Sequence, residues 1–489
     1  MVAATPAAPP PAGQPDDPVA RTIGRVEGTG EASERPPGAA VARLTLAATI
    51  LGSSMAFVDS SVVNVALHAI ETDLGGGLAT QQWVVDAYLL TLGSLILVGG
   101  SLGDLFGELR IFALGVASFG LVSALCAAAP DAAALIVLRG LQGVAGALLT
   151  PASLALLTAT FAGPARGAAI GQWTAWTGIA FVIGPLLGGW LVGVASWRVI
   201  FLLNVPLALV TLLLLRRLGA RGAARRSEVR ADVAGALLCT GGLGLLVAGF
   251  IEQPHLGWRD PLVPAAIGGG VVLLAAFAAY ELRTPAPMLP LHLFRLRNFS
   301  VANLETLTVY GALSGLSVFL ALFLLELGGY SPLQAGLALL PVTLVMFLLS
   351  RLSGRLAMQY GPRLFMGLGP IVAGASVLAY ARLPVHLDYW VDLLPALLGF
   401  SLGLSLTVAP LTTTVLADAG PGDAGVASGV NTAVARVAGL VAVAVLGVAA
   451  AGGSDRLTLR GFHTVVLIVA ALLVAGGLLG ALGLRNQRT

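Results

Sequence analysis

The sequence from Gly178 to Trp190 reads G-I-A-F-V-I-G-P-L-L-G-G-W and lies inside an apolar run from Ala168 to Val194. That run is long enough for the roughly 20 residues that a membrane-spanning helix needs. Its helix-weakening residues are Gly178, Gly184, Pro185, Gly188 and Gly189. Between packed membrane helices, small residues let backbones approach closely, and neighbouring groups satisfy the carbonyl that a proline frees. The stretch therefore predicts a membrane helix that packs tightly against its neighbours. The glycines and the proline serve either this packing alone or a function as well.

The composition extends this prediction to the whole chain. Of its 489 residues, 57% are hydrophobic and 10% are charged, and the mean hydropathy is +0.91. A soluble protein of this size would need far more polar side chains to cover its core. The chain is therefore predicted to be an all-α membrane protein with many spans. Its two cysteines, Cys126 and Cys239, lie in apolar segments far apart in sequence and imply no disulfide framework.

Apolar segments of spanning length recur along the chain, and their boundaries are defined to within a few residues. We expect fourteen spans, at 43–70, 80–103, 109–129, 132–160, 167–193, 197–215, 233–251, 262–281, 299–325, 333–354, 364–382, 391–415, 424–450 and 462–484. Residues 1–42 are rich in Pro, Ala and Gly and predict a disordered cytoplasmic tail without a cleavable signal peptide. Residues 485–489 form a second short tail.

The arginines predict the orientation of the chain, which contains no lysine. With the N-terminus in the cytoplasm, roughly twenty arginines fall in the tails and the loops of that side. About five fall on the opposite side, at Arg198, Arg259, Arg382, Arg456 and Arg460. Because cytoplasmic loops carry the excess of positive charge, both termini are predicted to be cytoplasmic. The exclusive use of arginine indicates a GC-rich bacterial genome, and hence a bacterial plasma membrane.

Two pairs of segments indicate an internal repeat. The sequence G-S-L-G-D-L-F-G at 100–107 and the sequence G-R-L-A-M-Q-Y-G at 354–361 share a G-x-L-x4-G spacing. A second pair opens the fifth and thirteenth spans, at 166–175 and 424–433, with a similar offset and the same direction. We therefore expect two parallel six-helix repeats, at 43–216 and 299–484, joined by a linker at 217–298 that holds two extra helices.

Two acids fall inside the first two predicted spans. Asp59 lies near the centre of the first span, and Asp86 lies about one and a half turns into the second. A carboxylate at such a depth costs several kcal/mol unless it faces water or a partner, so an intramembrane acid indicates a functional site. Asp59 is expected either to carry a proton or to form a structural hydrogen bond between helices. Asp86 either shares proton or cation duty with Asp59 or has no such role.

Two arginines also fall inside predicted spans. Arg139, followed by Gln142 in the fourth span, must pair inward because a lone arginine in lipid is costly. Arg436 lies near the middle of the thirteenth span. It is expected to bind an anionic group of a substrate or to pair with an acid, for which Glu305 in the ninth span has a suitable depth. A purely structural ion pair between Glu305 and Arg436 is the alternative.

Further polar and aromatic residues are candidates for contact with a substrate. Trp173 and Trp176 in the fifth span are able to stack on a planar or cationic ligand, although packing or lipid contact explains them equally well. Together with residues already introduced, the candidate substrate-binding set is Asn64, Gln142, Trp173, Trp176, Glu305, Asn431 and Arg436.

These motifs resemble those of the fourteen-span drug:H+ antiporters (EmrB/QacA-like) of the major facilitator superfamily. The first span is similar to L-D-x-T-x-V-N-V-A-L-P, with Val58, Ser61 and His68 as departures. The fourth span has R-x-x-Q-G, and the fifth has G-x5-G-P-x-x-G-G. The loop after the second span resembles G-x-L-a-D-r-x-G-r-k, with Gly100, Asp104 and Gly107 kept but most basic positions lost. The resemblance covers most of residues 43–484.

The resemblance implies a fold, an activity and residue roles. The fold is the major facilitator bundle with two added central helices, and the activity is proton-coupled export by alternating access. Asp59, Asp86 and Arg139 would couple protons, Asp104 would latch helix ends in one conformation, and the glycine-rich fifth span would allow the bundles to rock. Because most basic positions of the loop motif are lost, the motif indicates either an altered latch or simple sequence drift.

Three functions remain open at this point. The first is a proton-coupled exporter of drugs or other amphipathic molecules, the second a dedicated exporter of one metabolite, siderophore or sugar, and the third a membrane sensor or scaffold that has lost transport. The sequence has no G-K-[ST] phosphate loop, H-E-x-x-H or G-x-S-x-G motif, which argues against ATP-driven transport and against a hydrolase. We expect no cofactor, no metal and no nucleic acid partner, and a monomer.

Overall fold

The computed structural model describes residues 39–161, 163–218, 232–284, 287, 289, 291–452, 454 and 456–485. All regular structure in these residues is helical. The helices are α2 (Ala39–Leu74), α3 (Gly77–Phe106), α4 (Glu108–Ala127), α5 (Ala132–Thr160), α6 (Gly163–Val194), α7 (Arg198–Leu202), α8 (Asn204–Leu218), α9 (Val233–Leu256), α10 (Leu262–Glu281), η1 (Leu291–Arg295), α11 (Arg297–Leu322), η2 (Phe323–Leu327), α12 (Pro332–Tyr360), α13 (Pro362–Val377), η3 (Leu378–Arg382), η4 (Tyr389–Leu393), α14 (Leu394–Ala451) and α15 (Leu459–Gly483). The predicted tail at 1–42 lies outside the described residues as far as residue 38.

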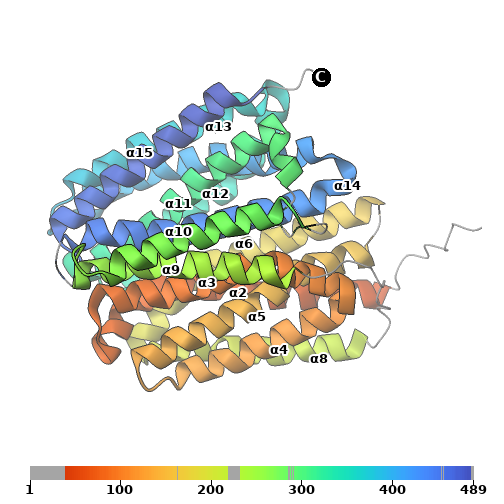
Figure 1. Ribbon diagram of the computed structural model, residues 1–489, viewed down its shortest axis with the longest axis horizontal. Helices are drawn as coiled ribbons and strands as arrows, with labels where there is room; N and C mark the ends of the chain where they lie inside the picture. The colour runs from red at the N-terminus through yellow and green to blue at the C-terminus, as the bar shows by residue number, and fades with distance from the viewer. Residues whose placement is uncertain are drawn as a thin grey trace, which may run out of the picture.

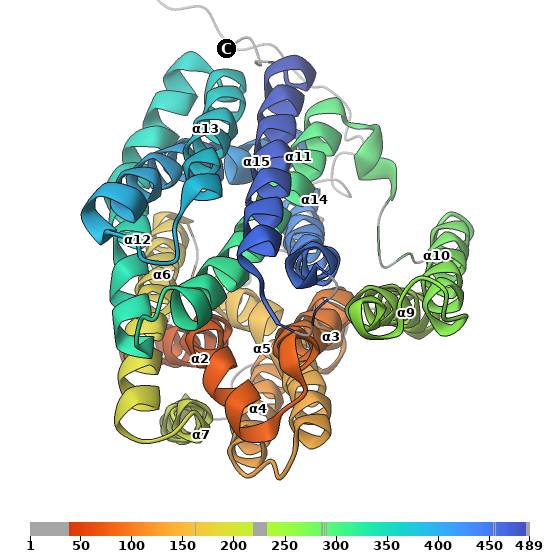
Figure 2. The same ribbon diagram turned by 90° about the vertical axis from the view of Figure 1, so that its left-hand side faces the viewer.

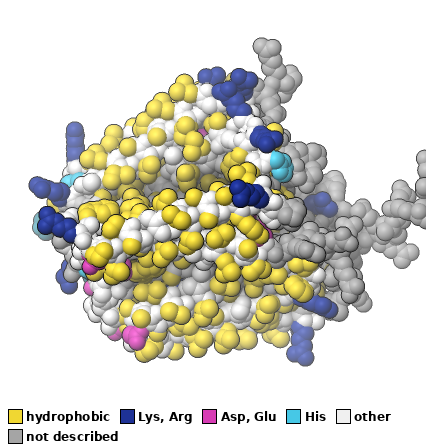
Figure 3. Space-filling model, viewed as in Figure 1, with side chains coloured by type: hydrophobic (Ala, Val, Ile, Leu, Met, Phe, Trp, Pro, Cys, Tyr) yellow, Lys and Arg dark blue, Asp and Glu magenta, His cyan; other side chains and the backbone are white. Residues whose placement is uncertain are grey.

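In the part of the chain that the structure describes, fourteen helical segments are long and apolar enough to cross a membrane, which confirms the predicted number. In the space-filling view, hydrophobic side chains cover the middle of the visible face, and most charged side chains lie toward its two ends (Figure 3). This banding is expected of a protein whose middle lies in hydrocarbon, where an exposed charge is costly. The protein is a multi-pass membrane protein.

The helices form two bundles and a separate pair (Figures 1 and 2). The first bundle contains α2–α8, and the second contains α11–α15. The pair α9 and α10 packs beside them, where α9 contacts both α3 and α14. Thr240 of α9 donates a hydrogen bond to Ser94 of α3 (2.9 Å), and Trp83 of α3 donates one to Glu252 of α9 (3.1 Å). The predicted fold class, two six-helix bundles with two added helices, is confirmed.

The repeated loop sequences have the same backbone conformation. Gly107 separates α3 from α4 with φ of 94°, and Gly361 separates α12 from α13 with φ of 85°. A residue with a side chain rarely adopts such a positive φ, so glycine is needed at both points. The two loops, which the sequence predicts to be related, thus contain the same glycine turn, one in each bundle.

Two spans differ from their predicted form. The sixth is interrupted between α7 and α8 at Leu203, because Pro206 has no N–H to offer the carbonyl of Leu202. The twelfth and thirteenth spans are both assigned to α14, although separate helices were predicted. Thr414 and Asn431 each contact a neighbouring helix near its start, at Met366 of α13 and Asn303 of α11.

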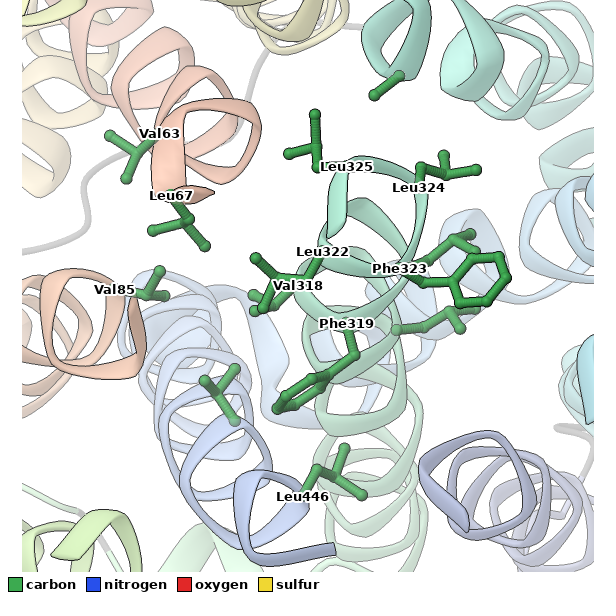
Figure 4. Packing of buried hydrophobic residues seen from close by; sticks show 14 of the residues in the cluster. Val63, Leu67, Val85, Val318, Phe319, Leu322, Phe323, Leu324, Leu325 and Leu446 are labelled. Carbon is green, nitrogen blue, oxygen red and sulfur yellow. The ribbon is translucent and has the colours of Figure 1, made fainter. Parts of the chain in front are cut away.

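The two ends of the molecule differ in how the bundles meet. We call the end where α2 begins and α15 finishes the proximal end, and the end with the turn between α2 and α3 the distal end. At the distal end, one hydrophobic cluster joins both bundles, with Leu67 and Val85 facing Val318, Leu322 and Leu446 (Figure 4). Toward the proximal end, the described clusters belong to one bundle each. The bundles are therefore sealed together at the distal end.

Candidate functional site

A buried ion pair lies inside the first bundle. Arg139 of α5 donates a hydrogen bond from Nη1 to Oδ2 of Asp59 on α2, with a separation of 2.5 Å. Both side chains are almost fully buried, each residue being 1% exposed. A charged group removed from water is stable only when paired and hydrogen-bonded. The two residues that the sequence singled out separately, 80 positions apart, thus meet in one contact.

Amide and hydroxyl groups complete the surroundings of Asp59. Gln142 donates to Asp59 Oδ1 (2.9 Å) and to Ser123 Oγ of α4 (2.8 Å), and it accepts from Arg139 Nη1 (2.7 Å). Asn204 of α8 donates to Asp59 Oδ1 at 3.2 Å and to Ser123 Oγ at 3.3 Å. The network therefore ties together four helices, α2, α4, α5 and α8, around one carboxylate.

The guanidinium of Arg139 is held on its remaining sides by α3 and α7. Its Nε donates to the carbonyl of Val84 (2.9 Å), and its Cζ lies 4.5 Å from the ring centre of Tyr88 and 5.8 Å from that of Phe201. An aromatic face attracts a cation most strongly where water is absent. Arg139 therefore keeps several favourable contacts that do not depend on the charge of Asp59.

The local sequence explains this arrangement. Arg139 and Gln142 are three residues apart on α5 and so share one helical face. Asn204 begins α8 directly after the break at Leu203, which turns its amide into the bundle. Asn204 and Ser123 were not among the predicted site residues. A lone amide in an apolar span two residues before a proline was a usable signal for Asn204, whereas serine is too common in membrane helices to mark Ser123.

The other two intramembrane acids are buried without partners. Asp86 and Glu305 are both 0% exposed, and none of their four carboxylate oxygens has a hydrogen-bond partner among the described residues. Asp86 shares a helical face with Gln82, which donates to the carbonyl of Val443 on α14 at 2.8 Å. Asp86 thus lies toward the second bundle, apart from the Asp59 network, and its predicted proton role stays a prediction.

The glycine-rich stretch of α6 packs against both bundles. A Cβ at Gly184 or Gly188 would clash with Ser61 or Val62 of α2, and a Cβ at Gly189 would clash with the carbonyl of Pro332 at the start of α12. In the reverse direction, a Cβ at Gly336 of α12 would lie 2.5 Å from the carbonyl oxygen of Pro185. These residues let the backbones of two bundles touch. Gly178, in contrast, has no neighbouring atom within 4 Å of such a Cβ.

The loop between α3 and α4 lacks the contact expected of a latch. Asp104 is exposed and forms no hydrogen bond or ion pair with any described residue. Gly107 provides the turn, and a Cβ added at Gly100 would make an ordinary contact with Pro151 of α5, 3.8 Å from its Cβ. Gly107 therefore has a structural role here, while the predicted roles of Gly100 and Asp104 stay predictions.

The candidate substrate-binding residues lie at several different places. Trp173 donates to Ser53 of α2 (3.0 Å) and packs edge-on against Phe57, so its indole is held by the first bundle. Trp176 is 55% exposed. Asn431 donates to Thr306 (2.7 Å) and Asn303 (3.2 Å) of α11. Asn64 is half-buried on α2 and has no side-chain hydrogen bond in the part of the chain that the structure describes.

The proposed pairing of Glu305 with Arg436 is wrong for this conformation. No ion pair joins them among the described residues. Glu305 instead points its Oε2 toward Gly480 of α15, where a Cβ would lie 2.8 Å from that oxygen. Arg436 lies on the face of α14 that contacts α3, with its Cβ 3.1 Å from a Cβ placed on Gly93. The sequence places Glu305 and Arg436 at similar depths in the membrane. Their side chains nevertheless face different helices, α15 for Glu305 and α3 for Arg436.

A family model described as Major Facilitator Superfamily matches residues 49–443. The chain belongs to the major facilitator superfamily. Among its relatives in this superfamily, the puromycin resistance protein pur8 of Streptomyces alboniger is 38% identical over 405 residues, covering 81% of this chain and 79% of that one. The tetracenomycin C resistance and export protein of Streptomyces glaucescens is 34% identical and covers 83% and 75%. The multidrug resistance protein Stp of Mycobacterium tuberculosis is 35% identical and covers 83% and 75%.

Solved structures of the superfamily share the fold. A peptide transporter POT in complex with sulfate superposes with a TM-score of 0.68 at 15% identity, covering 90% of this chain and 93% of that one. A bacterial homologue of the human lysosomal transporter Spinster gives a TM-score of 0.68 at 15% identity, covering 91% and 98%. These likenesses establish the architecture of the two bundles. The superfamily membership makes the chain one of a family of transporters.

Proposed function

We propose that this chain is a proton-coupled exporter of drugs or other amphipathic small molecules, and that Asp59 binds the coupling proton. The observation that carries the proposal is the buried Asp59–Arg139 ion pair, closed by Gln142, Asn204 and Ser123. An ion pair that is shielded from water is strong while both charges exist and is lost when one is neutralised. Such a pair is suited to converting a proton-binding event into helix movement.

The network already provides for the neutral form of Asp59. A protonated carboxyl is a donor and needs an acceptor. Asn204 Oδ1 is buried and has no hydrogen-bond partner, so it is available as that acceptor after a rotation of the amide. Arg139 meanwhile retains the carbonyl of Val84, Gln142 and its aromatic neighbours. Proton binding therefore weakens the link between α2 and α5 at Arg139 and leaves each side with bonds of its own.

A weaker link between α2 and α5 is proposed to change how the bundles meet. Helix α2 packs against α6 through Gly184 and Gly188, and α6 contacts α12 of the second bundle. A shift of α2 is thus transmitted to the seam between the bundles, where alternating access requires rocking. The proximal end, which carries most arginines in adjoining loops and tails, faces the cytoplasm in this proposal. The distal seal then closes the external side.

The class of substrate is supported by the relatives. The chain matches at least three quarters of the length of three resistance or export proteins. Their names refer to puromycin, to tetracenomycin C and to multidrug resistance. The same proposal includes a monomer in a bacterial plasma membrane, with divisions at 43–216, 217–298 and 299–484, no enzymatic activity and no cofactor. A dedicated exporter of a single compound is the alternative, which resistance to one compound instead of several unrelated ones would favour.

The test is efflux from proteoliposomes with an imposed proton gradient, with and without an uncoupler. Three amphipathic dyes, one cationic, one neutral and one anionic, serve as substrates. We expect uncoupler-sensitive transport of at least one dye, and its loss in Asp59→Asn.

The matched control for this test is Asp73→Asn. Asp73 lies on the same helix and pairs with Arg198, but its side chain is 47% exposed, so the same chemical change there leaves transport near wild type. Undiminished transport in Asp59→Asn would remove Asp59 from proton coupling. If none of the three dyes is transported, the proposal that the chain exports amphipathic molecules is rejected.

A further inference from the structure

Five charged residues lie within the spans of the two bundles and away from their ends. These residues are Asp59, Asp86, Arg139, Glu305 and Arg436. Four of them are at most 1% exposed, whereas Arg436 is only half-buried. A molecule that enters between the bundles therefore meets one accessible charge within the described spans, and that charge is positive.

Arg436 lies at the seam between the bundles. Its Cβ packs against Gly93 of α3. One helical turn away, Gly439 packs against Ser314 of α11, so this part of α14 lies where α3 and α11 converge on it. Gly93 has no side chain, which lets α3 approach α14 closely at Arg436.

No acid in the described spans neutralises Arg436. Asp59 is bound to Arg139, and the oxygens of Glu305 point to α15. Asp86 has no partner at either oxygen, and therefore none in Arg436. Arg436 itself forms no hydrogen bond or ion pair with a described residue. An arginine within a membrane span is costly unless it is paired or faces a watery path.

We propose that Arg436 binds the anionic group of the exported molecule, and that the preferred substrates are amphipathic organic anions. This inference rests on the proposed export function. A guanidinium presents two parallel N–H donors that match a carboxylate, sulfonate or phosphate, which gives it orientation as well as charge. The same charge disfavours a cationic substrate, which would lose its hydration beside an unpaired positive group. The proton site at Asp59 is closed inside the first bundle, whereas Arg436 lies at the seam, so the substrate and the proton occupy different sites.

The test compares two dyes that share a xanthene core but differ in charge, the anion fluorescein and the cation rhodamine 6G. Binding to the purified full-length protein in a neutral detergent is followed by fluorescence anisotropy. We expect the wild type to bind fluorescein more tightly than rhodamine 6G. We expect Arg436→Gln to lose at least tenfold in affinity for fluorescein, and Arg436→Lys, which keeps the charge, to lose less.

Arg460→Gln provides the matched control, because Arg460 is exposed at the start of α15 and the substitution changes net charge by the same amount. It is expected to bind fluorescein like wild type. Unchanged fluorescein binding in a monodisperse Arg436→Gln protein overturns the inference, as does a wild type that prefers rhodamine 6G. Displacement of fluorescein by phosphatidylglycerol without fluorescein transport identifies a lipid site and overturns it as well.

The two proposals fail in different ways. If fluorescein binding requires Arg436 but no dye is moved by a proton gradient, the anion site stands and proton-coupled export is rejected. If a cationic dye is exported in an uncoupler-sensitive manner and Arg436→Gln leaves it unchanged, export stands and the anion site is rejected.

Discussion

In the first bundle the carboxylate of Asp59 bonds to Arg139, Gln142 and Asn204. In the second bundle neither oxygen of Glu305 has a partner among the described residues, and Arg436 forms an ion pair with none of them. The bundles share their helix order and the glycine turn at Gly107 and Gly361. Their charges are nevertheless arranged oppositely. One bundle stores a closed ion pair, and the other leaves a positive charge accessible at the seam. The two bundles thus share a fold but differ in how their intramembrane charges are arranged.

Breaking the closed pair is expected to have the largest effect. In Asp59→Asn an amide can face Arg139, and the lost ion pair leaves a buried cation uncompensated, which costs about 3–5 kcal/mol of unfolding free energy. Adding Arg139→Gln removes that cation, so most of the stability should return while transport stays absent. Thermal unfolding in detergent measures the first quantity and proton-driven dye efflux the second. Recovery of transport in the double variant would show that the pair serves only stability.

Separating the bundles at α6 is expected to have the next largest effect. A Cβ in Gly189→Ala meets the backbone carbonyl of Pro332, which cannot move aside as a flexible side chain would. Overpacking of this kind costs about 1–3 kcal/mol, and it acts in the distally sealed state, so transport should fall by about tenfold. Gly178→Ala is the control, since it makes the same substitution on the same helix where no atom lies within 4 Å. Equal transport in both variants would reduce the glycine-rich stretch to ordinary helix.

Sequence alone predicted the features that depend on length and composition. Fourteen spans, two related bundles and an added helix pair follow from apolar segment length and the repeated glycine spacing, and the structure has all three. The break at Leu203 and the assignment of two spans to α14 were missed, because hydropathy averages over helix breaks and turns.

The candidate site was predictable in its residues but only partly in its contacts. Depth in the membrane can be read from position, so Asp59, Arg139 and Arg436 were all identified. Which helical face meets which neighbour depends on tertiary packing, and this is why Glu305 was matched to Arg436 although it faces Gly480. The roles of Asn204 and Ser123 required the folded bundle, since their effect comes from helices α4 and α8 converging on Asp59.

Weakening the distal seal is expected to have a moderate effect. Gln81 of the first bundle donates to Glu326 of the second at 2.6 Å, and His68 lies 3.6 Å from the same carboxylate. A hydrogen bond to a charged group is worth about 1 kcal/mol more than a neutral one. Glu326→Gln should therefore shift the equilibrium about fivefold toward distal opening. Spin labels on Thr72→Cys and His386→Cys, both at exposed distal positions, report the change as longer distances.

The labelling needs no removal of the native cysteines, because Cys126 and Cys239 are both buried. Glu252→Gln is the matched control at the same end, where Glu252 accepts a bond from Trp83 that joins α9 to α3 and does not join the two bundles to each other. It should leave the distance distribution unchanged. An identical shift in both variants would mean that the Gln81–Glu326 bond does not hold the bundles together.

Neutralising Glu305, the unpaired acid of the second bundle, is expected to have the smallest effect. Glu305→Gln keeps the shape of a side chain whose oxygens have no partner to lose, and its amide can donate toward the nearby carbonyl of Met366 beside Gly480. Because Glu305 has no hydrogen-bonded partner to lose, the unfolding free energy should fall by less than about 1 kcal/mol. Proton-driven efflux should stay within about twofold of wild type. If Glu305→Gln instead abolishes transport as Asp59→Asn does, the second bundle also carries a coupling proton, and the contrast between the bundles holds only for the conformation with the distal end closed.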